Sequence, residues 1–115
     1  AIVRDGRMVF VTEPLLVGYN NPTCFGREKD LDARCADIYS IPVTKGDVII
    51  CGSDGIFDNV WLRQIEKLVG SADGLLAFAI ETASQKGEVD IPFYKQWVDK
   101  SDGKIDDMTL IIQRI

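Results

Sequence analysis

Two short apolar stretches of this sequence have acidic residues close to one end. They lie at 48–51 and 110–112; Asp54 and Asp58 follow the first, and Asp106 and Asp107 precede the second. Near-continuous apolar runs of this length are typical of buried strands. If the two strand ends adjoin in one sheet, four carboxylates converge, and such groups repel one another unless water screens them or a cation lies among them. The pattern predicts a site for one hard cation, which prefers oxygen ligands, at a sheet edge.

Each acidic residue also has an ordinary structural interpretation. Asp58 or Asn59 could cap a helix that begins near Val60, and Asp-Gly, as at 54–55, is a common turn pair. The pair Asp106-Asp107 alone could equally form a solvated turn. What favours the functional interpretation is that the acids occur together at the ends of two strongly apolar strands.

Turn and periodicity signals predict two antiparallel hairpins. Asp5-Gly6 lies between two β-rich runs, which is the strongest short-range hairpin signal in a single sequence. The segment ADIYSIPV alternates apolar and polar residues, and Lys45-Gly46 turns it towards the apolar run that follows, which predicts a second hairpin. The expected strands are at about 1–4, 7–12, 36–43, 48–51 and 108–115.

Between the two acidic regions the hydrophobic period changes to that of a helix. Segments 60–69 and 71–86 both repeat apolar residues at helical spacing, and Gly70 and Gly87 are expected to end them. Residues 13–36 show no sustained period and predict a long loop. The order of elements predicts an α+β fold in which an antiparallel sheet carries a helix pair on one face.

Composition narrows the possible chemistry. The net charge is −5 and the 13 Lys and Arg residues are scattered, so we expect no nucleic-acid partner, and no apolar stretch is long enough to indicate a membrane partner. The sequence has no histidine, which excludes Ser/His and Cys/His nucleophiles. Three cysteines without CxxC spacing indicate a reducing compartment, and Cys51 is expected in the core. Any chemistry must rest on oxygen ligands.

The two acidic regions resemble the C-terminal signature motifs of a known enzyme family. GDVIICGSDGIFDNV and GKIDDMTLIIQRI are similar, in order and separation, to motifs of the PP2C-type metal-dependent Ser/Thr protein phosphatases (PPM family). The hairpin IVRDGRMVF, the stretch at 91–93 and the Gly103-Lys104 lead into the last motif resemble the PTC7-like branch. The resemblance covers 1–12 and 37–115 and implies part of the family's α/β/β/α sandwich.

The resemblance implies a role for each acidic residue. Asp54 and Asp106 match ligands of a dinuclear centre that holds two Mg²⁺ or Mn²⁺ ions, and Asp58 matches an acid of a further, weaker metal site. Asp107 falls where many members have Asn, which implies that it supports the ligands without touching the metal. Gly55 is implied as the residue that lets the metal loop close.

In that family the metals activate a water that attacks phosphoserine or phosphothreonine without a phosphoenzyme intermediate. The family's N-terminal acids, its phosphate-binding arginine and its DGHGG-type motif do not occur here, so we expect residues 1–115 to be the C-terminal portion of the phosphatase domain. The portion alone is expected to be inactive, because two aspartates bind Mg²⁺ only weakly. Its expected partners are a phosphoprotein substrate, the missing N-terminal half and, through an uncovered sheet, a second copy.

Two alternatives remain open from the sequence. One is a phosphatase-like domain that has lost catalysis and serves as a binding or regulatory module. The other is an unrelated small α+β protein whose acids bind Ca²⁺ or nothing, although the chain lacks an EF-hand loop. An intracellular location, cytoplasmic or mitochondrial, is expected.

Overall fold

The computed structural model describes residues 1–16, 18, 20–23, 36–94 and 101–115. The chain forms two compact units, one of residues 1–11 with 44–115 and one of residues 12–43. The larger unit contains every helix and strand named below.

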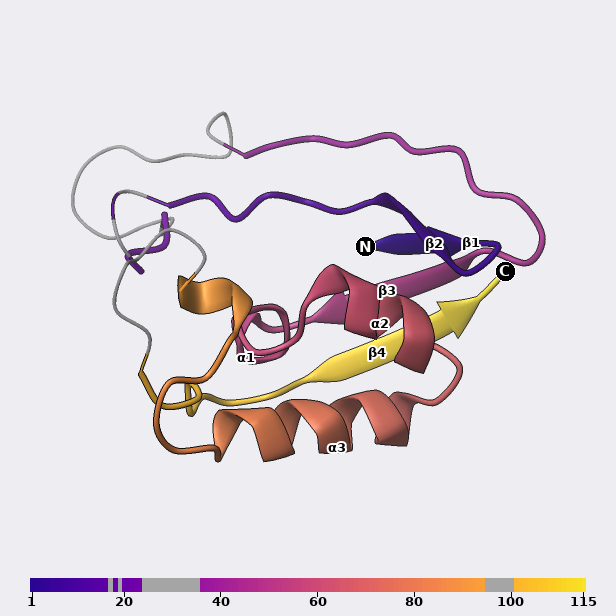
Figure 1. The fold of residues 1–115 in the computed structure, drawn as a ribbon. Coiled ribbons are helices and arrows are strands. Elements are labelled where there is room, and N and C mark those ends of the chain that lie inside the picture. The colour runs from indigo at the N-terminus through magenta and orange to yellow at the C-terminus, as the bar shows by residue number, and fades with distance from the viewer. Residues whose placement is uncertain (17, 19, 24–35, 95–100) are drawn as a thin grey trace. The chain divides into compact units, whose positions relative to one another are not determined.

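A four-stranded antiparallel sheet organises the larger unit (Figure 1). Its strands are β1 (Ile2–Arg4), β2 (Arg7–Phe10), β3 (Val48–Gly52) and β4 (Leu110–Arg114), in the order β2-β1-β3-β4. Between β1 and β2 the backbone φ is positive at both Asp5 (49°) and Gly6 (75°), as a tight two-residue hairpin turn requires. The first predicted hairpin and the last predicted strand are therefore confirmed.

Helices connect β3 to β4. They are α1 (Asp54–Phe57), α2 (Leu62–Leu68), α3 (Ala72–Ala83) and the short 3₁₀ turn η2 (Pro92–Tyr94). The Ser71 hydroxyl accepts a hydrogen bond from the Gly74 amide at 3.0 Å and caps the start of α3. The predicted helix pair is confirmed, although α3 ends at Ala83, before the expected stop at Gly87. No helix in the described parts of the chain is long and apolar enough to cross a membrane.

The core lies between the sheet and the helices. Helix α3 packs along β4 and α2 packs against α3 and β2 (Figure 1). In β3 the alternate residues Val48 and Ile50 are buried against the helices, as the period of a strand dictates. The buried core residues of this cluster are Val3, Val48, Ile50, Ile56, Val60, Ile65, Leu75 and Ala79. The predicted α+β architecture is confirmed.

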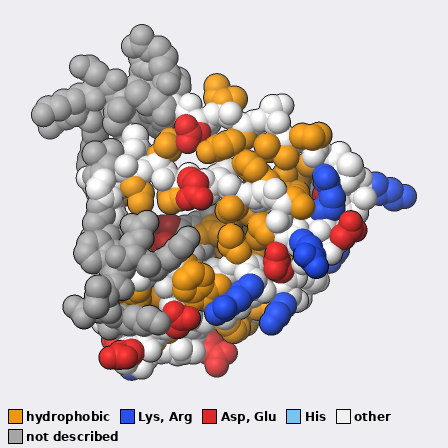
Figure 2. Space-filling model, turned by 45° about the horizontal axis from the view of Figure 1, so that its top comes forward, with side chains coloured by type: hydrophobic (Ala, Val, Ile, Leu, Met, Phe, Trp, Pro, Cys, Tyr) orange, Lys and Arg blue, Asp and Glu red, His pale blue; other side chains and the backbone are white. Residues whose placement is uncertain are grey.

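The other face of the sheet is more exposed. Cys51 is exposed and its strand partner Ile111 is 62% exposed. The expectation that Cys51 lies in the core is wrong, because its side chain points away from the helices. Figure 2 shows several hydrophobic side chains at the surface of the face it views, with Lys and Arg side chains gathered towards one side.

The second predicted hairpin is wrong. The turn itself forms, since the Asp47 amide donates to the Thr44 carbonyl at 3.0 Å and Gly46 has a positive φ of 99°. Residues 36–43, however, form no strand, and Ile38 is 90% exposed. The physical reason is that β3 already pairs with β1 on one side and β4 on the other, so neither of its edges is free for a hairpin partner.

Candidate functional site

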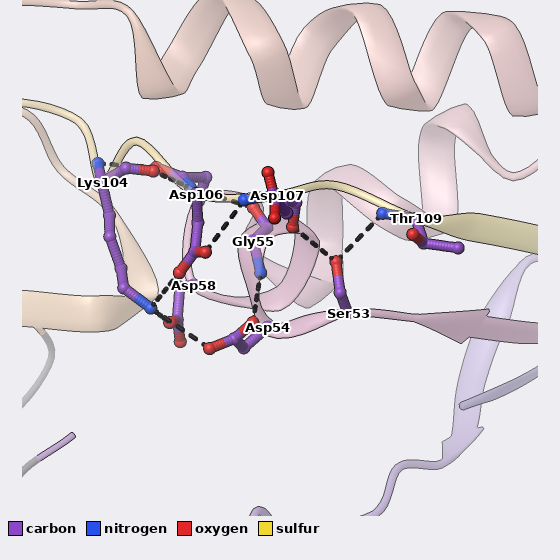
Figure 3. A network of polar contacts seen from close by, with 9 residues as sticks. Ser53, Asp54, Gly55, Asp58, Lys104, Asp106, Asp107 and Thr109 are labelled. Atoms are coloured by element: carbon purple, nitrogen blue, oxygen red, sulfur yellow. Dashed lines mark hydrogen bonds and ion pairs between the residues drawn. The ribbon is translucent and has the colours of Figure 1, made fainter. Parts of the chain in front are cut away.

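The end of β3 and the start of β4 meet at one edge of the sheet. Gly52 pairs with Leu110, so the loop that follows β3 and the loop that precedes β4 leave the sheet side by side. Ser53 joins them: its amide donates to the Thr109 carbonyl (3.0 Å), and its hydroxyl donates to the Asp107 carbonyl (2.9 Å) and accepts from the Thr109 amide (3.0 Å) (Figure 3). The predicted adjacency of the two acidic loops is confirmed.

Gly55 brings the backbones of the two loops into direct contact. It is buried in α1, and a Cβ atom at this position would lie 2.5 Å from the Asp107 carbonyl oxygen. No side chain fits that gap without moving backbone, so the close approach depends on glycine. The structure thus supplies a physical reason for the glycine to which the resemblance assigned loop closure.

Asn59 holds the loop that precedes β4 through hydrogen bonds to its backbone. Its side chain is 1% exposed and donates from Nδ2 to the carbonyl oxygens of Gly55 (2.9 Å) and Lys104 (2.7 Å). Its Oδ1 accepts from the Lys104 amide at 3.0 Å. Asn59 therefore acts as a clamp between α1 and the residues before β4. It does not cap the start of the next helix, since α2 begins after Trp61.

Three of the four predicted acidic side chains converge on one ammonium group (Figure 3). Lys104 Nζ lies 2.5 Å from Asp58 Oδ2, 3.0 Å from Asp106 Oδ2 and 3.3 Å from Asp54 Oδ2. The Lys104 side chain is only 13% exposed. The site is therefore an acidic cluster with a cation already at its centre.

The electrostatics follow from this crowding. Burial raises the pKa of the Asp58 carboxyl, the ammonium of Lys104 opposes that rise, and the charges of Asp54 and Asp106 add to it. The hydrogen bond from Lys104 lowers the pKa of Asp106. Burial lowers the pKa of Lys104 itself, but the hydrogen bonds and charges of its carboxylate partners outweigh burial and leave that pKa above its ordinary value.

Asp107 takes no part in the ion pairs of the cluster. Its backbone amide donates to Asp106 Oδ1 at 2.9 Å and its carbonyl accepts from Ser53, so the residue orders the loop through its main chain. This position agrees with the expectation that Asp107 is not a direct ligand, which stays a prediction.

An aromatic turn borders the cluster. The Phe93 amide donates to the Asp58 carbonyl at 3.0 Å, and the Phe93 ring centre lies 5.0 Å from Lys104 Nζ. Tyr94 packs edge-on against Phe93 and donates its hydroxyl to the Asp102 carbonyl at 3.0 Å. Turn η2 therefore packs against the ammonium that the three acids share.

As the side chains stand, the described residues contain no group of three or more His, Cys, Asp or Glu that could hold a metal ion. The metal-ligand assignments of Asp54, Asp106 and Asp58 stay predictions. Sequence reasoning noted Asn59 only as a possible cap and Lys104 only as part of a motif. The charge of Lys104 two residues before Asp106 was the available signal.

The chain is similar to plant proteins that are named protein phosphatase 2C. No family model matches the chain. Protein phosphatase 2C 24 of Oryza sativa subsp. japonica is 29% identical over 131 residues, which cover 100% of this chain and 41% of the relative. Protein phosphatase 2C 26 of Arabidopsis thaliana is 29% identical over 136 residues, which cover 99% of this chain and 46% of the relative.

A solved structure shows the same fold. The X-ray structure of the photosystem II phosphatase PBCP matches with a TM-score of 0.82 at 22% identity, covering 99% of this chain and 54% of that one. The chain thus spans less than half the length of the two curated relatives. The resemblance to PP2C-type phosphatases is confirmed, whereas the PTC7-like branch stays a prediction.

Proposed function

We propose that this relative of the protein phosphatases 2C is the C-terminal portion of a metal-dependent phosphatase domain that hydrolyses phosphoserine and phosphothreonine in proteins. The observation that carries the proposal is the convergence of Asp54, Asp58 and Asp106 where β3 and β4 meet. These acids lie in the two motifs on which the resemblance rests.

The donor chemistry of the cluster fits a hard divalent cation. Its groups are carboxylate oxygens, the ligands that Mg²⁺ and Mn²⁺ prefer, and they already surround one positive charge. In this proposal Asp54 and Asp106 hold the two ions of a complete site, and Asp58 serves a weaker one. Such ions, when bound, would lower the pKa of a water molecule so that it can act as a nucleophile near neutral pH, and would offset negative charge on the phosphoryl group.

Residues around the acids hold them in place. Ser53 and Asn59 hold the two acidic loops together by hydrogen bonds, and Gly55 allows their backbones to touch. A rigid frame keeps carboxylates close despite their mutual repulsion, which is the condition for a preorganised site. Two or three acids do not complete a dinuclear centre, so the chain alone is proposed to be inactive.

The remaining partners follow from how much of the relatives the chain covers. The match covers only part of each relative. We propose that the missing acids and the phosphate-binding group come from an N-terminal half of the domain. The sheet face that carries Cys51 and Ile111 is apolar and exposed, which supports contact with that half or with a second copy. The substrate is proposed to be a phosphoprotein.

A chimera tests the proposal. The unmatched part of Arabidopsis protein phosphatase 2C 26 would be joined to this chain, and Mn²⁺-dependent release of phosphate from a phosphothreonine peptide measured. We expect turnover that Asp54→Asn lowers by more than the roughly 10- to 100-fold typical of residues that only support a ligand. Asp73→Asn is the control: Asp73 is an exposed residue of α3, so we expect its substitution to leave turnover unchanged.

A folded chimera without turnover would contradict the proposal. It would favour the alternative of a phosphatase-like binding or regulatory module. The observation that supports this alternative is the ammonium of Lys104, which stands among the acids where a metal would bind.

A further inference from the structure

The acidic cluster and its cation belong to the same chain. Nζ of Lys104 lies within 3.3 Å of a carboxylate oxygen of each of Asp54, Asp58 and Asp106. A metal ion bound by these oxygens would need the space that the ammonium fills, and its positive charge would repel the ammonium. The ammonium and the metal therefore exclude each other at these oxygens.

This ion pair differs from an ordinary surface contact. Lys86 pairs with Asp102 at 3.0 Å, but their side chains are 73% and 46% exposed, and exposed pairs contribute little. The Lys104 side chain is 13% exposed and contacts three acids, of which Asp58 is 26%, Asp106 36% and Asp54 66% exposed. Water screens the ammonium less than it screens that of Lys86, so its attraction is stronger, above all to Asp58.

The backbone of Lys104 is fixed while its side chain can leave. Asn59 bonds both the amide and the carbonyl of Lys104, so residue 104 stays beside the acidic loops. A lysine side chain carries a compact ammonium group on a flexible stem of four carbons. The ammonium can therefore withdraw from the cluster without any change in the main chain.

We propose that Lys104 is a built-in competitor for the metal site: its ammonium occupies the acidic cluster of the metal-free chain and is displaced when Mg²⁺ or Mn²⁺ binds. The inference rests on the proposed function for the identity of the metal. The lysine has two effects. It stabilises the empty site against repulsion among the acids, and it raises the metal concentration needed to fill the site.

Calorimetric titration with Mn²⁺ tests the competition directly. The chains compared are the unaltered one, Lys104→Met, which removes the charge, Lys104→Arg, which keeps it, and Lys86→Met as the matched control. We expect Lys104→Met to bind Mn²⁺ more tightly by about tenfold or more, an effect that one lost ion pair near a protein surface can produce. The affinities of Lys104→Arg and Lys86→Met stay close to that of the unaltered chain.

Thermal unfolding gives a second readout that needs no enzyme activity. Without metal, the melting temperature of Lys104→Met is lower than that of the control because the three acids repel one another. Adding Mn²⁺ raises the melting temperature of Lys104→Met by more than it raises that of the unaltered chain. Equal or weaker Mn²⁺ affinity in Lys104→Met, or no binding in any of the chains, would overturn the inference.

Failure of the inference is distinguishable from failure of the proposed function. An active chimera in which Lys104→Met leaves the affinity for Mn²⁺ unchanged contradicts only the competition. An inactive chimera, with tighter Mn²⁺ binding in Lys104→Met, contradicts only the phosphatase activity and keeps the competition.

Discussion

Both ends of β3 bring acidic side chains next to a basic one, but the balance of charge differs between the two ends. Before β3, Asp47 is 0% exposed and meets the guanidinium of Arg4 with both oxygens, at 2.8 and 2.7 Å. The Thr44 amide donates to the same carboxylate at 2.8 Å. One negative charge is matched by one positive charge and by backbone, which is typical of a structural ion pair.

After β3, one ammonium serves three carboxylates. The ion pairs of Lys104 with Asp54, Asp58 and Asp106 leave negative charge in excess, and the hydrogen bonds of Ser53 and Asn59 hold the loops close nonetheless. An arrangement that keeps like charges together stores electrostatic free energy that a divalent cation would release. Excess charge in a rigid frame, more than burial, therefore distinguishes this candidate cation site from the structural ion pair before β3.

The largest expected loss of stability comes from substituting Gly103, the residue before Lys104. A Cβ at this position would lie 2.1 Å from the Thr82 carbonyl oxygen and 2.6 Å from that of Ala83. Because backbone must move, we expect Gly103→Ala to lower the free energy of unfolding by about 3 kcal/mol or more. Urea titration measures the loss. Gly70→Ala is the control, since its Cβ would meet nothing within 4 Å; an equal effect of both changes would contradict the account.

A smaller loss is expected from removing the clamp. Asn59→Ala leaves the Lys104 amide and the carbonyls of Gly55 and Lys104 without these partners. We expect the free energy of unfolding to fall by about 2–3 kcal/mol, the scale for buried polar groups left unsatisfied. Urea titration measures the stability. Calorimetric titration with Mn²⁺ measures the affinity, which we expect to fall because the acidic loops are held less firmly. Asn59→Ala with the stability of the unaltered chain would show that the clamp is not needed.

The smallest effect is expected from breaking the ion pair before β3, between Arg4 and Asp47. The hydrogen bond from Arg4 comes first in holding the pKa of Asp47 well below its ordinary value. Such a group stabilises the fold above the ordinary carboxyl pKa, and this stability is lost as the pH falls through the lowered pKa. Arg4→Met should therefore shift acid unfolding to higher pH. Urea midpoints measured from neutral to acid pH show this shift, with Arg63→Met as the control because the Arg63 side chain is 71% exposed. Coincident curves of midpoint against pH for the two variants would contradict the expectation.

Local signals explain what the sequence predicted correctly. Asp5-Gly6 specifies the first hairpin by turn chemistry alone, and the near-continuous apolar run at 48–51 predicted a buried strand, of which Val48 and Ile50 lie in the core. Segment 36–43 has the alternation of a strand but forms none, because strand pairing depends on a partner far away in the sequence.

The same limit explains the site. The acids were predicted because each follows or precedes an apolar run, a local pattern. Asn59 and Lys104 act on each other across 45 residues, and no spacing rule connects them. The missed residues are thus those whose role exists only once β3 and β4 lie side by side.

If the excess negative charge after β3 forms a cation site, calorimetric titration of the 115-residue chain with Mn²⁺ will detect binding at these acids. The comparison uses Asp54→Asn, Asp106→Asn and the control Asp73→Asn. We expect weak binding that is lost in the first two variants and kept in the control. Binding that is indifferent to all three changes would contradict it and leave these acids as parts of turns.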